Sequence, residues 1–363
     1  MALCSTKWST LNMIRRHSPI AHAAYADLVA SLKDDAVAEL RGTPTRVERN
    51  GKVYWYDTFR VGSDVRKAYV GEDNDEIRAR LARHAELAAR RAEAQAARAR
   101  TIRILRAEGF LGVDGATGAL LNAFAQAGVF RLGGTIVGTQ AFRLYEGELG
   151  LRYNFDQTAQ TNDIDIASFE RLSLALDDEA SPPLQSILKD FSFEAAPQLQ
   201  RTGAWRWRQT RGDLLVEFLT PSFDESEGVR PLAALHVEAQ ALHHLNFLIA
   251  DPIAAAVPYR RGVLVQVPRP ERFAIHKLIV ADRRKDGPNS LKAVKDRGQA
   301  AFLIDALAED RPDDLVEAYR DAAARGPRWS QRLAATLARM PQTRQRLEQA
   351  GVTISSEGSE PRQ

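Results

Sequence analysis

Polar and apolar residues alternate at residues 162–167, Asn-Asp-Ile-Asp-Ile-Ala, and this period of two predicts a short strand. Residues two apart on a strand point to the same face. We therefore expect Asp163 and Asp165 to share one face, while Ile164 and Ile166 point into a core. An exposed strand with alternating polar residues is the simplest alternative.

Other stretches predict both helices and strands. Capping residues and helix-forming composition indicate helices at 19–41, 75–108 and 116–127, and the second holds neither Gly nor Pro. Strand signals occur at 45–48, 52–61, 66–71, 128–132, 204–208, 214–221 and 263–268. Asn50-Gly51 predicts a hairpin between the first two strands. Helices follow from residue 270, with breaks expected near Pro312, Gly326-Pro327 and Pro341.

Composition limits the class of protein. The 363 residues suffice for two or three domains, and 44% hydrophobic with 27% charged residues is typical of a soluble globular protein. A net charge of +3 permits a nucleic-acid or nucleotide partner without requiring one. The single cysteine, Cys4, excludes an internal disulfide and a multi-cysteine zinc site. Because we see neither a signal peptide nor a run long enough to span a membrane, we expect a cytoplasmic protein without a membrane partner.

The two aspartates are candidate metal ligands. Like charges held side by side are costly unless a cation lies between them. Hard carboxylate oxygens suit Mg²⁺, which also binds phosphate oxygens. Upstream, the segment Val137-Gly138-Thr139-Gln140 predicts a turn that opens a helix. Backbone N–H groups at such a helix start can bind the phosphates of a nucleoside triphosphate.

The order of a Gly-Thr turn, a helix and T-x-D-I-D-I resembles the nucleotidyltransferases of the polymerase β superfamily. The closest likeness is to a bacterial group with G-T-x-A-F-x-x-Y followed by T-x-D-I-D-[LIV]-A. The matching residues are Gly138, Thr139, Ala141, Phe142, Tyr145, Thr161, Asp163, Asp165 and Ala167. Since the gap between turn and carboxylates is longer than in compact members, the turn at Gly133, Gly134 and Thr135 is a second candidate phosphate contact.

The resemblance also implies a third carboxylate on a later strand. Glu217 lies within the apolar segment Leu214–Pro221, where a charged residue needs a reason. By resemblance it is a metal ligand or the base for the attacking hydroxyl, although many members have Asp there. The alternative is an edge-strand glutamate that reaches solvent; we favour the functional interpretation.

The pattern V-P-x-P-E-x-F-A-x-x-K, followed by a basic stretch and Lys295-Asp296, resembles the later part of AbiEii-type nucleotidyltransferase toxins. The resemblance implies that Lys277 neutralises phosphate charge and that Asp296 orients it or a nearby ligand. Lys277 is equally well explained as a solvated helical lysine. Arg283, Arg284 and Lys285 either line the mouth of the site or face water. We expect the pair His243-His244 to pack or to lie at the surface.

The resemblance implies an α+β fold: a nucleotidyltransferase-like mixed sheet flanked by helices, with a small N-terminal helix and β-hairpin region and a helical C-terminal region. We divide the chain into an N-terminal helix and small antiparallel sheet (1–74), a long helical arm (75–112), the nucleotidyltransferase core (113–268), a helical C-terminal domain (269–352) and a disordered tail (353–363). The N-terminal sheet interleaves aromatic and basic residues, which suits nucleic acid, but packing against a helix is the favoured explanation.

These observations predict a Mg²⁺-dependent nucleotidyltransferase, with one or two ions, that moves a nucleoside monophosphate from an NTP to an acceptor hydroxyl and releases pyrophosphate. The acceptor is an RNA, a protein or a small molecule. The alternative is an inactive core of the same fold that binds nucleic acid or a protein partner. The likeness to AbiEii-type toxins adds RNA modification by a toxin as a third hypothesis.

Overall fold

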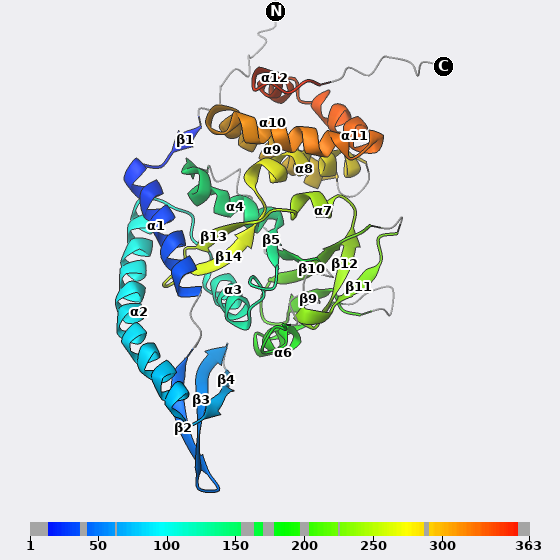
Figure 1. Ribbon diagram of the computed structural model, residues 1–363. Helices are drawn as coiled ribbons and strands as arrows, with labels where there is room; N and C mark the ends of the chain where they lie inside the picture. Colours follow the sequence, from blue (N-terminus) through cyan, green and yellow to red (C-terminus); the bar gives the residue numbers. More distant parts are fainter. Residues whose placement is uncertain are drawn as a thin grey trace, which may run out of the picture.

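The computed structural model describes residues 14–36, 42–61, 64–153, 163–169, 178–196, 203–223, 226–286 and 290–354. A mixed sheet lies in the middle of the molecule, an N-terminal arm runs down one side of it, and helices stack above it (Figure 1). The chain is therefore α+β, with a helical C-terminal region, as the sequence predicted. Cys4, Thr161 and the tail beyond Ile354 lie outside the described residues.

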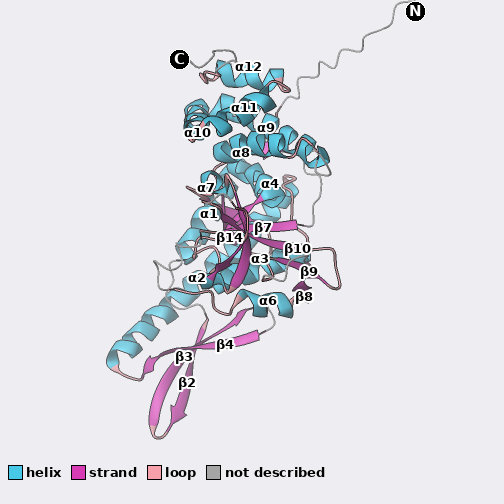
Figure 2. Cartoon of the chain, turned by 90° about the vertical axis from the view of Figure 1, so that its right-hand side faces the viewer, coloured by secondary structure: helices cyan, strands magenta, loops and turns pink. Residues whose placement is uncertain are grey.

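The N-terminal arm consists of α1 (Pro19–Ala36), the strands β2 (Thr43–Arg49), β3 (Lys52–Val61) and β4 (Asp64–Glu72), and α2 (Asp75–Ala107). The hairpin turn lies at Asn50 and Gly51, both with positive φ, as expected for an Asn-Gly turn. The three-stranded sheet projects away from the rest of the molecule (Figure 2). The predicted hairpin and the long helix are both confirmed.

The arm is attached to the body through α1. Arg98 of α2 binds Asp35 of α1 at 2.7 Å, and a small core that includes Leu28 and Leu105 fills the space between the two helices. On the other side of α1, the buried hydroxyl of Tyr25 accepts a hydrogen bond from the Ala256 backbone N–H in β13 (Ile253–Val257). Because these contacts are buried, α1 joins α2 to the central fold.

The central sheet has the order β11-β12-β10-β7-β5, with β9 beside β10 and β8 beside β9. Its central strand β10 runs parallel to β7 and β12 and antiparallel to β9. The strands are β5 (Thr135–Val137), β7 (Asp163–Ala167), β8 (Phe193–Ala195), β9 (Arg206–Gln209), β10 (Leu215–Pro221), β11 (Val229–Leu232) and β12 (Val237–Leu242).

Helices and two small strand pairs surround this sheet. Short strands pair β1 (Arg15–Arg16) with β6 (Leu151–Arg152), and β13 with β14 (Val263–Val267). The helices that pack around the sheet are α3 (Gly115–Ala127), α4 (Gly138–Leu149), α6 (Leu184–Asp190) and α7 (Leu245–Leu248), with the 3₁₀ turn Ala233–Leu235 between β11 and β12. Phe142 and Tyr145 of α4 are fully buried, and the Tyr145 hydroxyl donates to the Pro268 carbonyl.

The expected strand at 128–132 is wrong. Gly128 takes a left-handed conformation and ends α3, and Gly133 is left-handed as well, so the backbone between them turns instead of extending. Val129 and Leu132 are nevertheless fully buried. Their apolar character reflects burial inside a turn, and the strand begins only at Thr135.

The C-terminal region is a stack of helices: α8 (Pro270–Arg283), α9 (Ser290–Asp310), α10 (Pro312–Ala324), α11 (Pro327–Leu337) and α12 (Pro341–Gln349). The three breaks predicted from proline are helix starts, because proline fits the first turn, where its missing N–H is not needed. Helix α8 contacts α9, α10 and α11, and it lies on the side of the stack that faces the central sheet (Figure 1). In the described part of the chain, none of the helices has the length and apolarity to cross a membrane.

Candidate active site

Three carboxylates lie next to one another on two neighbouring strands. Asp163 and Asp165 are half-buried on β7, whereas Ile164 and Ile166 between and after them are fully buried. Glu217 of the parallel strand β10 is in register with Asp165. Residues in register on adjacent strands project from the same face of a sheet. The predicted alternation is confirmed, and Glu217 lies beside the aspartate pair.

Asp165 has a raised pKa. Burial, together with the nearby carboxylates of Glu217 and Asp163, raises the pKa of Asp165 to about 7, while Lys277 and Arg284 act in the opposite direction. Such a group holds its negative charge at a cost that a cation would relieve. The hard oxygen donors of Asp163, Asp165 and Glu217 suit Mg²⁺ in their chemistry.

Glu217 has a second partner. The guanidinium of Arg206, on the antiparallel neighbour β9, lies 2.5 Å from Oε1 of Glu217 and also covers the ring of Trp205. Over the described ranges, no three His, Cys, Asp or Glu side chains converge tightly enough to form a ready-made metal site. The three carboxylates are therefore neighbours, and one of them, Glu217, is engaged in an ion pair with Arg206.

The Gly-Thr turn lies directly against Asp165. Strand β5 ends at Val137, which pairs with Asp165, and α4 begins at the next residue. Gly138 has a φ of 64°, and a Cβ added there would overlap Oδ2 of Asp165. Only glycine fits this close approach. Thr139 follows in the first turn of α4, which has neither a side-chain cap nor an acidic residue.

The turn at Gly133, Gly134 and Thr135 lies farther along the strand pair. Thr135 pairs with Ala167, at the end of β7 opposite to Asp163, and the two glycines precede it. Thr135 is buried and its hydroxyl donates to the Gly133 carbonyl, while Gly134 packs against Val129. Of the two candidate turns, the one at Gly138 and Thr139 therefore lies beside the carboxylates, whereas the turn at Gly133, Gly134 and Thr135 lies at the other end of β7.

A cavity of about 330 Å³ opens in front of Gly138 and Asp165. One side comes from the sheet and the β12–α7 connection, and the other comes from a single face of α8. The residues that line it from α8 and its C-cap are Phe273, His276, Lys277, Val280, Arg283 and Arg284. Burial, followed by the neighbouring Lys277, lowers the pKa of His276 to about 3. This imidazole is therefore neutral near pH 7.

Lys277 and Arg284 share one buried carboxylate. Lys277 Nζ donates to Oδ1 of Asp296 at 2.5 Å, and Arg284 donates to Oδ2 at 2.8 Å. Burial alone would raise the pKa of Asp296, but the two cations outweigh it and lower the pKa. Asp296 is thus placed to fix both cations on the cavity wall. The expected contact of Asp296 with Lys277 is therefore observed, and Arg284 is its second partner.

His276 was not among the residues expected at the site, whereas Arg283, Arg284 and Lys285 were expected either to line its mouth or to face water. Arg283 and Arg284 line the cavity, whereas Lys285 pairs with Asp282 at 3.0 Å. The missed signal is periodic: residues 273, 276, 277, 280, 283 and 284 follow the three- and four-residue spacing of one helix face. His243, expected to pack or to lie at the surface, also lines the cavity and binds Glu227.

The site thus combines an acidic pair on a strand, a neighbouring glycine turn that opens a helix and a facing basic helix. A family model described as "Nucleotidyltransferase" matches residues 115–324, more than half of the chain, and the chain belongs to this family. A second model, described as a domain of unknown function (DUF6788), matches residues 20–79, which cover α1 and the projecting sheet. No curated protein and no solved structure matches the chain.

Proposed function

We propose that this protein is a Mg²⁺-dependent enzyme that transfers a nucleoside monophosphate from an NTP to an acceptor hydroxyl. The observation that carries the proposal is the register of Glu217 with Asp165, beside the start of α4 at Gly138. Family membership supports nucleotidyl transfer in general. The metal, the donor nucleotide and the acceptor are the parts that the proposal adds.

The donor triphosphate would bind between the start of α4 and the basic face of α8. The uncapped first turn at Gly138 and Thr139 offers backbone N–H groups and the positive end of the helix. Lys277 and Arg284, fixed by Asp296, face it across the cavity and neutralise phosphate charge. Positioning and charge neutralisation are the two contributions that phosphoryl-group chemistry requires of the protein.

Asp163, Asp165 and Glu217 would hold the magnesium. When bound, the ion supplies charge neutralisation and lowers the pKa of the acceptor hydroxyl. Glu217 joins this set once its ion pair with Arg206 opens. The raised pKa of Asp165 supports the assignment, because a buried carboxylate beside two others has the most to gain from a cation.

The reaction exchanges one phosphorus–oxygen bond for another. The acceptor oxygen forms a bond to the α-phosphorus, and the bond from the α-phosphorus to the bridging oxygen breaks. The electron pair leaves with the pyrophosphate. The proton of the acceptor hydroxyl passes to a carboxylate of the β7–β10 face or to water. Lys277 and Arg284 then stabilise the charge that develops on the leaving pyrophosphate.

The test begins with binding. Calorimetry with each NTP, with and without Mg²⁺, compares the wild-type protein with an Asp163→Asn, Asp165→Asn double variant. Asp190→Asn, which changes an exposed carboxylate at the end of α6, is the matched control. We expect metal-dependent binding that only the double variant loses. Failure of the wild-type protein to bind any NTP would contradict the proposal.

An inactive core of the same fold is the second candidate. The observation that favours it is the ion pair between Arg206 and Glu217, which occupies one of the three carboxylates. Label from an α-³²P NTP separates the candidates, since an active enzyme transfers it to an acceptor and an inactive core does not. RNA, protein and small-molecule pools serve as acceptors. Labelled RNA would support the RNA-modifying toxin hypothesis that the likeness to AbiEii-type proteins raises.

A further inference from the structure

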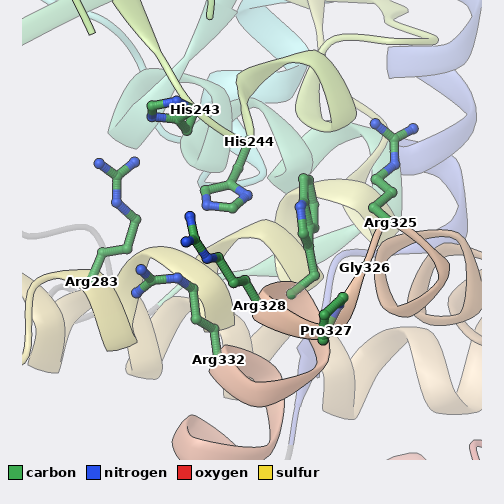
Figure 3. A pocket seen from close by; sticks show the side chains of 9 residues that line it. His243, His244, Arg283, Arg325, Gly326, Pro327, Arg328 and Arg332 are labelled. Atoms are coloured by element: carbon green, nitrogen blue, oxygen red, sulfur yellow. The ribbon is translucent and has the colours of Figure 1, made fainter. Parts of the chain in front are cut away.

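A second, larger cavity lies beside the one that we assign to the donor nucleotide. It has a volume of about 720 Å³ and lies between the β12–α7 turn, the end of α8 and the start of α11 (Figure 3). The described residues that line it include four arginines, two histidines and one tryptophan, and none of them is a carboxylate. The arginines are Arg283, Arg325, Arg328 and Arg332. A concave surface of this composition favours an anionic ligand.

The arginines differ in how they are held. Arg283 binds Glu227 at 2.8 Å, Arg332 binds Asp282 at 3.1 Å, and Arg325 binds Asp321 at 3.1 Å. These ion pairs fix the three guanidinium groups around the cavity. Arg328 makes no hydrogen bond or ion pair with any described residue, and Figure 3 shows it at the centre of the group. With respect to the described residues, Arg328 therefore has unused hydrogen-bonding capacity.

The start of α11 adds to the positive field. The helix begins at Pro327, so that Arg328 and Trp329 lie in its first turn, and that turn carries no acidic residue. Gly326 precedes it with a φ of 123°, a conformation that favours glycine. Burial, followed by Arg283 and Arg332, lowers the pKa of His244 to about 4. The imidazole of His244 is therefore neutral near pH 7, and the arginines supply the charge.

Aromatic rings form one wall of the cavity. The Trp329 ring is half-buried and meets His244 edge to face at 4.3 Å and Phe247 at 5.8 Å. The guanidinium of Arg325 covers both Trp329 and Phe247. A fixed tryptophan next to cations is the combination that binds nucleic acid without sequence preference, because bases stack on the ring and phosphates meet the arginines.

The two cavities adjoin, since His243 and Arg283 line both. The donor cavity already contains the helix start at Gly138 and the cations Lys277 and Arg284 for the triphosphate. The larger cavity adds volume for a nucleotide-sized group on the far side of Arg283. A ligand held there would lie next to the donor, where an acceptor must lie.

We propose that the arginine-lined cavity binds the acceptor, and that the acceptor is a single-stranded nucleic acid. Its phosphates pair with Arg283, Arg328 and Arg332, and a base stacks on Trp329. This inference rests on the proposed function, because it assigns the acceptor of the same reaction. It leaves the donor site to Gly138, Lys277 and Arg284.

Direct binding of a fluorescent, mixed-sequence single-stranded RNA tests the inference. The test variant is Arg328→Glu, which replaces the guanidinium with a carboxylate and so reverses the charge at the centre of the cavity. The matched control is Arg339→Glu, beyond the opposite end of α11, where the side chain is exposed. We expect Arg328→Glu to weaken RNA binding by about tenfold or more, and Arg339→Glu by less than about twofold.

Two further measurements identify what the cavity recognises. The slope of log Kd against log salt should fall by about 0.7 for each phosphate contact that Arg328→Glu removes. An oligomer of abasic sugar-phosphates should bind more weakly than RNA, because it lacks a base to stack. Poly-glutamate that binds as tightly as RNA would overturn the proposal in favour of an acidic protein segment.

The donor assay separates this inference from the proposed function. Arg328→Glu should bind NTP in Mg²⁺ as the wild-type protein does, and Asp165→Asn should still bind RNA. Equal loss of NTP and RNA affinity in Arg328→Glu would assign the cavity to the donor triphosphate and overturn the inference. RNA binding that is absent in the wild-type protein, or unchanged in Arg328→Glu, would also overturn it, even if nucleotide transfer is observed.

Discussion

Glu217 on β10 lies directly beside Asp165 on β7, because the two strands are parallel and these residues are in register. Each is flanked on its own strand by buried apolar residues, Ile164 and Ile166 on β7 and Val216 and Phe218 on β10. The proximity of two carboxylates is unfavourable in the absence of a cation. The fold therefore holds the carboxylates of Asp165 and Glu217 close together, and this proximity lowers its stability when no cation is bound.

Asp165→Asn should raise the stability of the protein and abolish its activity. The pKa of Asp165 is raised to about 7 from an ordinary value of 3.8, so the folded protein binds more protons than the unfolded one between these values, and its stability falls as the pH rises through them. In EDTA at pH 8, we expect Asp165→Asn to raise the free energy of unfolding by on the order of 2 kcal/mol. Nucleotide transfer should be abolished.

Denaturant unfolding of the two proteins at pH 4 and pH 8 checks this prediction. At pH 4 the wild-type carboxyl is protonated, and the difference in unfolding free energy should disappear. A variant that is less stable than the wild-type protein at pH 8 would contradict the electrostatic explanation.

Gly138→Ala should damage both the turn and the adjacent carboxylate. The left-handed φ alone costs roughly 1–2 kcal/mol for a residue with a Cβ, and that Cβ would displace Oδ2 of Asp165. We expect a lower melting temperature and loss of Mg²⁺-dependent NTP binding. Gly112→Ala is the control, because no atom lies within contact distance of a Cβ there and its φ is not positive. Similar NTP affinity in both variants would argue against a phosphate site at this turn.

Asp296→Asn should destabilise the protein because it leaves Lys277 buried beside Arg284 without a shared counterion. Removing one partner of a buried ion pair typically costs about 3–5 kcal/mol. The double variant Lys277→Met, Asp296→Leu should recover most of this stability, since the buried lysine charge is removed and Arg284, which also loses Asp296, has a side chain that is 39% exposed to solvent. Neither variant should transfer nucleotides, because both change Lys277 or the carboxylate that holds Lys277 and Arg284 at the donor cavity. Chemical denaturation checks the first part, and a transfer assay that detects normal activity would contradict the second.

His276→Gln should make the protein less sensitive to acid. The folded pKa of His276 is about 3 and the unfolded value is 6.5, so the unfolded chain binds the extra proton between them. The stability of the wild-type protein that depends on this group is therefore present above pH 6.5 and is lost as the pH falls toward 3. We expect the variant to lose less unfolding free energy between pH 6.5 and 4, by up to about 1.4 kcal/mol per pH unit. Equal slopes would contradict the prediction.

The parts of the fold that follow local rules were predictable. Proline marked three helix starts, Asn50-Gly51 marked the hairpin, and the alternation around Asp163 and Asp165 fixed which faces are polar and which are buried. The expected strand at 128–132 failed because an apolar run shows burial but does not distinguish a buried turn from a strand.

The site was predictable only where its residues share one segment or a family pattern. Register between β7 and β10 depends on the sheet order, which no local pattern encodes, and the ion pair of Arg206 with Glu217 depends on a third strand. The same holds for Arg284 and Lys277, whose common partner Asp296 comes from another helix. Pairings over such distances along the chain need the tertiary structure.

The acidic and the basic residues of the candidate site lie in different parts of the sequence, and this separation matters during synthesis of the chain. A ribosome adds Asp163, Asp165 and Glu217 well before it adds Lys277, Arg284 and Asp296. At roughly 5–20 residues per second, the nascent chain carries Asp165 for several seconds before Lys277 and Arg284, the cations that act on it, exist. The carboxylates on β7 and β10 thus reach their final electrostatic environment only after α8 and α9 have emerged. The site is therefore completed late in translation, although its acidic strands are synthesised early.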